Sequence, residues 1–117
     1  MKRLIDRFRW AFRGMASAWR EEANFRIQAA AAVLALGTLA WLEAPAQWWA
    51  TFLLCIGGVM SLELVNTALE NMLDALHPAQ HPLVAKAKDC AAGATLLFSL
   101  VSVCVFIAFL AERCVTG

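Results

Sequence analysis

Three long apolar segments restrict the fold of this chain more than any other feature of its sequence. They cover residues 27–42, 48–62 and 90–111. Each is close to the ~20 residues that a helix needs to cross a ~30 Å hydrocarbon core, the first only with help from flanking residues. The chain is 62% hydrophobic, well above the share in a soluble domain. The sequence therefore predicts an all-α membrane protein, with one domain over residues 1–117 and three transmembrane helices.

The N-terminal segment has the pattern of an amphipathic helix. Apolar residues recur at helical spacing between residues 2 and 20, and basic residues such as Arg3 mostly occupy the opposite side. A helix of this kind lies in the membrane surface. We expect a surface helix over 2–20 and spans at about 23–42, 47–76 and 89–111, the last two separated by a loop with two X-Pro steps.

The distribution of Lys and Arg predicts the orientation. Most of these residues precede the first span, and Lys86 and Lys88 lie before the third, whereas the turn at Pro45 has no positive charge. By the positive-inside rule, the N-terminus and the 75–89 loop are cytoplasmic, and the Pro45 turn and the C-terminus lie outside. Arg113 is the exception. A signal peptide would share part of the N-terminal layout, but this basic segment is longer and more patterned.

Four polar residues form a stripe at the end of the second span. Glu63, Asn66, Glu70 and Asp74 are three or four residues apart, so on a helix they fall within an arc of about 80°. An intramembrane carboxylate costs several kcal/mol unless it is paired or faces water. By helical rise, Glu63 lies near the inner edge of the hydrocarbon, and Glu70 about 10 Å further out. Such a stripe suggests a site that meets both a lipid and a metal.

Further ionisable residues, Glu22, Lys88 and Asp89, are predicted at the same cytoplasmic face. Carboxylates at aqueous depth suit Mg²⁺ that is also held by phosphate oxygens. A lysine suits a phosphate, and a carboxylate at the lipid boundary suits a base that acts on a lipid hydroxyl. The residues alone favour phosphoryl transfer to a lipid only slightly, because a proton- or cation-coupled carrier uses the same groups. A non-catalytic scaffold with a charged interface is a third possibility.

Structural alternatives stay open for several residues. The arginines of the surface helix can serve simply as an anchor to anionic lipid. Glu22 and Arg26, one turn apart, can form an ordinary helix pair. Asn24 and Gln28 are amides at the membrane edge, where such groups usually find partners on neighbouring helices. The four cysteines show no metal spacing and are expected to pack as small apolar residues.

A longer motif resembles a known family. Glu63-Leu-Val-Asn66-Thr-Ala-Leu-Glu70-x-x-x-Asp74, followed by Ala87-Lys88-Asp89-x-x-x-Gly/Ala, is similar to the signature of the bacterial integral-membrane diacylglycerol kinases, which include the undecaprenol kinases. The resemblance covers nearly the whole chain, including the stretch from Trp19 to Arg26. It implies a homotrimer in the bacterial cytoplasmic (inner) membrane with active sites at subunit boundaries, which uses ATP and Mg²⁺ and binds no nucleic acid.

The resemblance also implies roles for individual residues. Glu63 is expected to be the general base, supported by Asn66, and Glu22 and Glu70 are expected to hold Mg²⁺. The expected nucleotide contacts are Arg3, Trp10, Glu22, Glu70, Ala79, Gln80, His81, Lys88 and Asp89. The expected lipid contacts are Arg7, Arg9, Trp19, Asn24, Arg26, Gln28, Trp41, Trp49, Glu63 and Ala92.

A few positions bear on the identity of the acceptor lipid. Gln28 stands where the diacylglycerol kinases often have an acid and the undecaprenol branch often a histidine, and Ala92 replaces a serine of some members. The His81-Pro-Leu stretch and the segment from Lys88 to Ala94 favour the undecaprenol branch. We expect ATP- and Mg²⁺-dependent phosphorylation of a lipid hydroxyl at the cytoplasmic face. Diacylglycerol, giving phosphatidic acid, is slightly preferred over undecaprenol, giving undecaprenyl phosphate.

Overall fold

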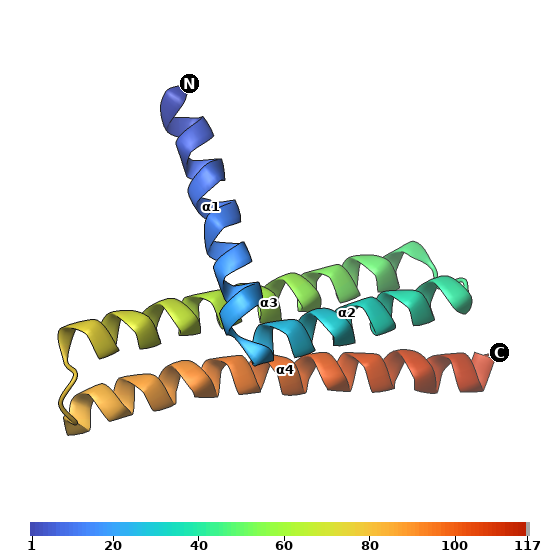
Figure 1. The fold of residues 1–117 in the computed structure, drawn as a ribbon. Coiled ribbons are helices and arrows are strands. Elements are labelled where there is room, and N and C mark those ends of the chain that lie inside the picture. Colours follow the sequence, from blue (N-terminus) through green and yellow to red (C-terminus); the bar gives the residue numbers. More distant parts are fainter. Residues whose placement is uncertain (117) are drawn as a thin grey trace.

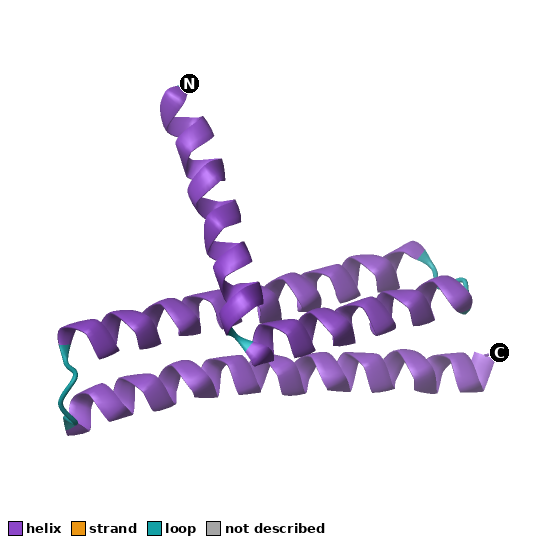
Figure 2. Ribbon diagram, viewed as in Figure 1, coloured by secondary structure: helices purple, strands orange, loops and turns teal. Residues whose placement is uncertain are grey.

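The computed structural model describes residues 1–116, which form four α-helices and no strand. These are α1 (Lys2–Glu21), α2 (Ala23–Trp41), α3 (Ala46–Leu76) and α4 (Pro82–Thr116). Helices α2, α3 and α4 lie side by side, while α1 projects steeply away from them (Figure 1). Only short loops join the four helices (Figure 2). Because α2, α3 and α4 are each long and apolar enough to cross a membrane, the predicted all-α class with three spans is confirmed.

The change of direction between α1 and α2 occurs at Glu22. Its backbone is extended (φ −112°, ψ 109°), so it ends α1 and begins α2 at once. The guanidinium of Arg26 donates to the carbonyl oxygens of Trp19 (2.6 Å) and Arg20 (3.2 Å), which lie in the last turn of α1. These carbonyls have no partner within the helix. Arg26 therefore caps α1, and this bonding replaces the Glu22–Arg26 pair that the sequence allowed.

Helices α3 and α4 pack antiparallel at the end of the molecule that carries the α2–α3 turn. The ring of Phe109 is fully buried there, with its centroid 5.2 Å from that of Trp48. The indole nitrogen of Trp48 donates to the carboxylate of Glu112 at 2.6 Å. Further along, the ring of Phe98 lies where Gly58 has no side chain, so a Cβ at that position would collide with it. These contacts fix how α3 and α4 are offset along their axes.

Helix α4 is longer than the span of about 89–111 that the sequence indicated. It begins at Pro82. Proline suits the first turn of a helix, because the N–H that it lacks would have no partner within the helix there. The ring nitrogen Nδ1 of His81 accepts a bond from the backbone N–H of Leu83 (3.1 Å) at this helix start. The loop between α3 and α4 is thus limited to residues 77–81. Lys88 and Asp89, expected in the loop, lie on α4 itself.

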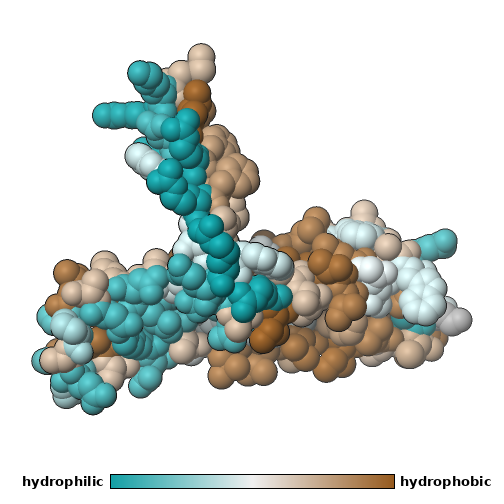
Figure 3. Space-filling model, viewed as in Figure 1, coloured by the Kyte–Doolittle hydropathy of each residue, from teal (hydrophilic) through white to brown (hydrophobic). Residues whose placement is uncertain are grey.

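The long helices exceed the thickness of a membrane. Helix α3 has 31 residues, a length of about 46 Å against a hydrocarbon core of ~30 Å. Hydrophilic surface gathers on α1 and at the end that carries the α3–α4 loop, whereas apolar surface covers the middle of the bundle (Figure 3). The protein is therefore a multi-pass membrane protein in which the last turns of α3 and the first turns of α4 extend out of the hydrocarbon.

Candidate functional site

The polar stripe on α3 runs from buried to exposed along the helix. Glu63 is only 6% exposed and is one of two buried polar residues in the described chain. Asn66 and Glu70 are half-buried, and Asp74, nearest the α3–α4 loop, is exposed. The same face of α3 carries the apolar residue Val59 one turn before Glu63, and Val59 is also buried. One face of α3 therefore changes from apolar to acidic at Glu63.

Three of the predicted site residues are gathered by the fold. Glu22, at the α1–α2 junction, and Glu70 both lie near enough to Glu63 for their charges to act on its carboxyl group. Carboxylates that approach one another repel, so a cation stabilises such an arrangement. The structure thus brings Glu22, which begins α2, close to Glu63 of the stripe on α3.

The donor set fits a metal that arrives with a nucleotide. Within residues 1–116, no group of three or more His, Cys, Asp or Glu side chains is placed to hold a metal by itself. Mg²⁺, however, is usually bound through one or two carboxylates together with substrate phosphates and water. Glu22 and Glu70 supply that number of carboxylates. Two carboxylates fit a Mg²⁺ that is also held by phosphates and water, and they are too few to form a closed structural metal site.

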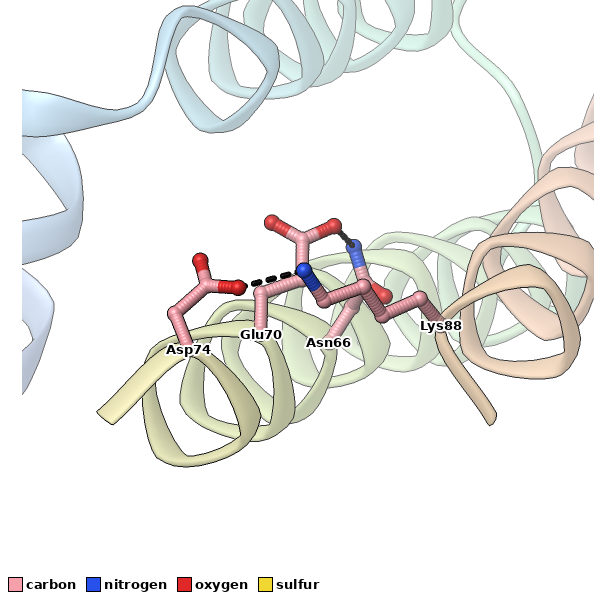
Figure 4. Close-up of polar contacts among 4 residues, drawn as sticks. All are labelled: Asn66, Glu70, Asp74 and Lys88. Carbon is pink, nitrogen blue, oxygen red and sulfur yellow. Dashed lines mark hydrogen bonds and ion pairs between the residues drawn. The ribbon is translucent and has the colours of Figure 1, made fainter. Parts of the chain in front are cut away.

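Asn66 is partly unsatisfied. Its amide nitrogen donates to Glu70 Oε1 at 3.2 Å (Figure 4), which orients both side chains. Its amide oxygen Oδ1 is buried and has no hydrogen-bond partner. A buried acceptor without a donor is unfavourable, and most such atoms in proteins are satisfied by water or a ligand. Asn66 Oδ1 is therefore an acceptor available to a bound group beside Glu70.

Lys88 forms an ion pair with Asp74 across the space between α4 and α3 (Figure 4). Lys88 is half-exposed and Asp74 is exposed. Asp74 belongs to the predicted stripe, but the family resemblance implies no role for it. The signal for Asp74 in the sequence is its position one turn after Glu70, together with the opposite charge of Lys88 in the segment that follows. Asp89, the neighbour of Lys88, is exposed on α4.

The remaining predicted nucleotide contacts lie in three places. Ala79, Gln80 and His81 lie exposed in the α3–α4 loop, at the same end as Asp74. Trp10 lines a groove of about 410 Å³ between α1 and α3. Arg3 lies near the N-terminal end of α1, which projects away from the bundle (Figure 1). A single chain therefore does not bring Arg3 to the carboxylates, because α1 leaves the bundle at its other end.

The predicted lipid contacts are similarly spread. Arg7, Arg9 and Trp19 are exposed on α1. Trp41 and Trp49 lie at the α2–α3 turn, at the opposite end from the α3–α4 loop. The amide of Gln28 donates to the hydroxyl of Ser99 on α4 at 3.3 Å, so it has the interhelical partner expected of an amide at this depth. Asn24 and Ala92 are exposed.

An apolar cavity of about 490 Å³ lies between α2, α3 and α4 within the membrane span. Gln28 and Ser99 contribute to its wall, and Val59 and Met60 line it one turn from Glu63 on α3. Small side chains on α2, such as Ala35, leave the space open. Its volume is within the range of about 300–1,000 Å³ found for small-molecule sites. No pattern in the sequence predicts this cavity.

The chain is similar in sequence to known proteins. The sequence pattern of the family described as prokaryotic diacylglycerol kinase matches residues 9–110. An undecaprenol kinase from Bacillus subtilis is 44% identical over 104 residues, which are 87% of this chain and 83% of that protein. A diacylglycerol kinase from Synechocystis is 41% identical over 105 residues, 87% of this chain and 59% of that protein. A diacylglycerol kinase from Escherichia coli is 31% identical over 101 residues, 86% of this chain and 83% of that protein.

Proposed function

We propose the following mechanism for this chain, which belongs to the prokaryotic diacylglycerol kinase family and is therefore a lipid kinase. The enzyme transfers the γ-phosphoryl group of ATP to a lipid hydroxyl at the cytoplasmic face of the bacterial inner membrane. The observation that supports this most is the meeting of Glu22, Glu63 and Glu70 where the apolar face of α3 becomes acidic. A lipid hydroxyl and a nucleotide phosphate can meet only at such a boundary.

Glu63 acts as the general base. It lies at the boundary of the stripe, where a lipid hydroxyl held at headgroup depth is within reach. The hydroxyl oxygen forms a bond to the γ-phosphorus, the bond from that phosphorus to the β–γ bridging oxygen breaks, and ADP leaves. The hydroxyl proton passes to the Glu63 carboxylate. Asn66 orients Glu70 through its amide N–H, and its carbonyl oxygen would accept a hydrogen bond from a water that hydrates the nucleotide-bound Mg²⁺.

Glu22 and Glu70 hold the Mg²⁺ of the nucleotide, which when bound neutralises charge on the phosphates. Lys88 binds a phosphate oxygen, and Asp89 and the loop residues 79–81 contact the rest of the nucleotide. Their support is position, since the α3–α4 loop and the start of α4 lie at the acidic end of the stripe. Trp10, in the groove between α1 and α3, extends this surface.

The acceptor lipid places its headgroup at Glu63 and its hydrocarbon chain along the bundle. The apolar cavity supports this placement, because it lies on the same face of α3 one turn deeper in the membrane. Gln28 stands in its wall, which keeps this residue among the proposed lipid contacts. An undecaprenol kinase and diacylglycerol kinases match the chain over similar lengths, so both acceptors stay candidates. We retain diacylglycerol slightly ahead.

The active unit is a homotrimer with sites between subunits. Asp74, the partner of Lys88, is three turns beyond Glu63, about 16 Å along the axis of α3. A phosphate bound by Lys88 of one chain is therefore far from Glu63 of that chain. Arg3 lies in the first turn of α1, and Glu22 follows the last turn of this 20-residue helix, so Arg3 is likewise remote from the carboxylates of its own chain. In a trimer, a neighbouring subunit can supply the Lys88 and the Arg3 that the carboxylates of one chain lack.

Removal of either proposed metal ligand is expected to raise the Mg²⁺ requirement. In Glu22→Gln and Glu70→Gln, the Mg²⁺ concentration for half-maximal activity should rise at least about tenfold, since even the loss of an outer partner lowers metal affinity by that factor. The measurement is a Mg²⁺ titration of the kinase reaction at saturating ATP and lipid. Glu43→Gln, which removes an exposed acid from the α2–α3 turn, is the matched control. An unchanged Mg²⁺ dependence in both site variants contradicts the assignment.

A competition assay determines the acceptor. Purified protein is given ATP and a mixed micelle that contains diacylglycerol and undecaprenol together. The preferred lipid is phosphorylated in proportion to its kcat/KM, whatever its absolute rate. We expect a modest preference for diacylglycerol. A tenfold preference for undecaprenol would reverse the order of the two acceptors, and phosphorylation of neither lipid would refute both.

A further inference from the structure

The ion pair between Asp74 and Lys88 has a consequence for the nucleotide site. Asp74 ends the acidic stripe of α3, and Lys88 stands on the second turn of α4, so the pair bridges the two helices just beyond their loop. We propose that Asp74 is a positioning residue, which holds the Lys88 ammonium at the exposed end of the stripe where nucleotide phosphates enter. This inference rests on the proposed role of Lys88 in nucleotide binding.

The pair is poorly placed to serve stability. The side chain of Asp74 is 63% exposed and that of Lys88 is 36% exposed. Ion pairs exposed to water contribute little to folding, because solvent screens them and both side chains lose freedom. The packing of α3 against α4 is already fixed by Phe109, by the Trp48–Glu112 bond and by the contact of Phe98 with Gly58. The main effect of Asp74 is therefore on the conformation of Lys88.

The chemistry of lysine explains why a fixed ammonium is useful. A lysine ammonium carries three donors on a flexible stem, and the bond to Asp74 uses one of them. The other donors stay available to phosphate oxygens. A lysine that is already ordered loses less entropy when the nucleotide arrives.

Asp74 also determines which carboxylate the lysine meets. Glu70 is one turn earlier on the same face of α3 and is held by the amide of Asn66 (Figure 4). A Lys88 ammonium that paired with Glu70 would neutralise a proposed Mg²⁺ ligand. Because Lys88 pairs with Asp74, the charge of Glu70 stays available for the metal. Asp74 thus separates the phosphate-binding cation from the metal-binding carboxylate.

The first test compares Asp74→Asn, Asp74→Glu and the control Glu43→Gln in the full-length protein. Asp74→Asn should raise the KM for ATP about tenfold, the factor that corresponds to ordering a free lysine side chain. The kcat at saturating ATP should change by less than about twofold, because the reacting groups are untouched. Asp74→Glu should recover most of the wild-type KM, since it restores the acid. A lowered melting temperature with an unchanged KM would show a structural role and overturn the proposal.

The second test is a double-mutant cycle on the dissociation constant of ATP, measured by calorimetry without acceptor lipid. If Asp74 acts through Lys88, Asp74→Asn should weaken ATP binding in the wild type and have no further effect in Lys88→Ala. If each substitution weakens ATP binding independently, so that the two factors multiply in the double variant, the positioning role of Asp74 is overturned. If Lys88→Ala binds ATP normally, the proposed nucleotide role of Lys88 is wrong and the inference falls with it. If only Lys88→Ala weakens binding, the role of Asp74 alone is refuted.

Discussion

Glu63→Gln should lower turnover by a factor on the order of 10²–10⁴, the usual contribution of a positioned general base. Glutamine has nearly the shape of glutamate but cannot accept the proton of the lipid hydroxyl. Since Glu63 is 6% exposed, a side chain of the same shape preserves the packing around it. Removal of a negative charge on which Glu22 and Glu70 act should also leave the fold intact. The measurement is the kcat for lipid phosphorylation at saturating ATP, Mg²⁺ and acceptor.

The Glu63→Gln experiment needs evidence that only the chemical step has changed. The dissociation constant of ATP should stay within about twofold of the wild-type value, because Glu63 is not among the proposed nucleotide contacts. The oligomeric state in detergent should also be unchanged. Near-normal turnover would remove Glu63 from the role of base, whereas loss of ATP binding would show that the substitution had disturbed the neighbouring carboxylates.

Mixing two inactive subunits should restore activity. One subunit carries Glu63→Gln and the other Lys88→Ala, so neither homotrimer has a complete site. If Glu63 of one chain works with Lys88 of the next, about a third of the sites in trimers that contain both kinds of subunit have both native residues. The expected activity of these mixed trimers is therefore about a third of the wild-type value. The physical reason is the separation of about 16 Å along α3 between Glu63 and Asp74, where Lys88 is held.

The mixing experiment depends on true heterotrimers. Subunits with two different affinity tags are co-expressed, and only assemblies that retain both tags are assayed. A mixture of Glu63→Gln with wild-type subunits is the control, and it should follow the fraction of wild-type Glu63. Activity that stays at the level of the parent variants in verified heterotrimers would show that Glu63 and Lys88 act from the same chain. The proposal of sites shared between subunits would then be wrong.

The sequence by itself determines the features that depend on a single helix. Three apolar segments of membrane length can fold only in a few ways, so the three spans follow from composition and length. The spacing of Glu63, Asn66 and Glu70 places them on one face of α3, independently of how the rest of the chain folds. The signature around these residues is that of the family to which the chain belongs.

Relations between helices depended on the tertiary structure. Helical periodicity determines which residues share a face, but the offset and rotation of neighbouring helices are set by packing, here by Gly58 against Phe98 and by the Trp48–Glu112 bond. The pairing of Lys88 with Asp74 follows from that offset. The turn at Glu22 likewise brings a residue far from the stripe in sequence to Glu63, while it directs Arg3 away. The cavity arises because small side chains on α2 face the apolar side of α3. Which side of one helix faces another is decided by packing and cannot be read from the order of the residues.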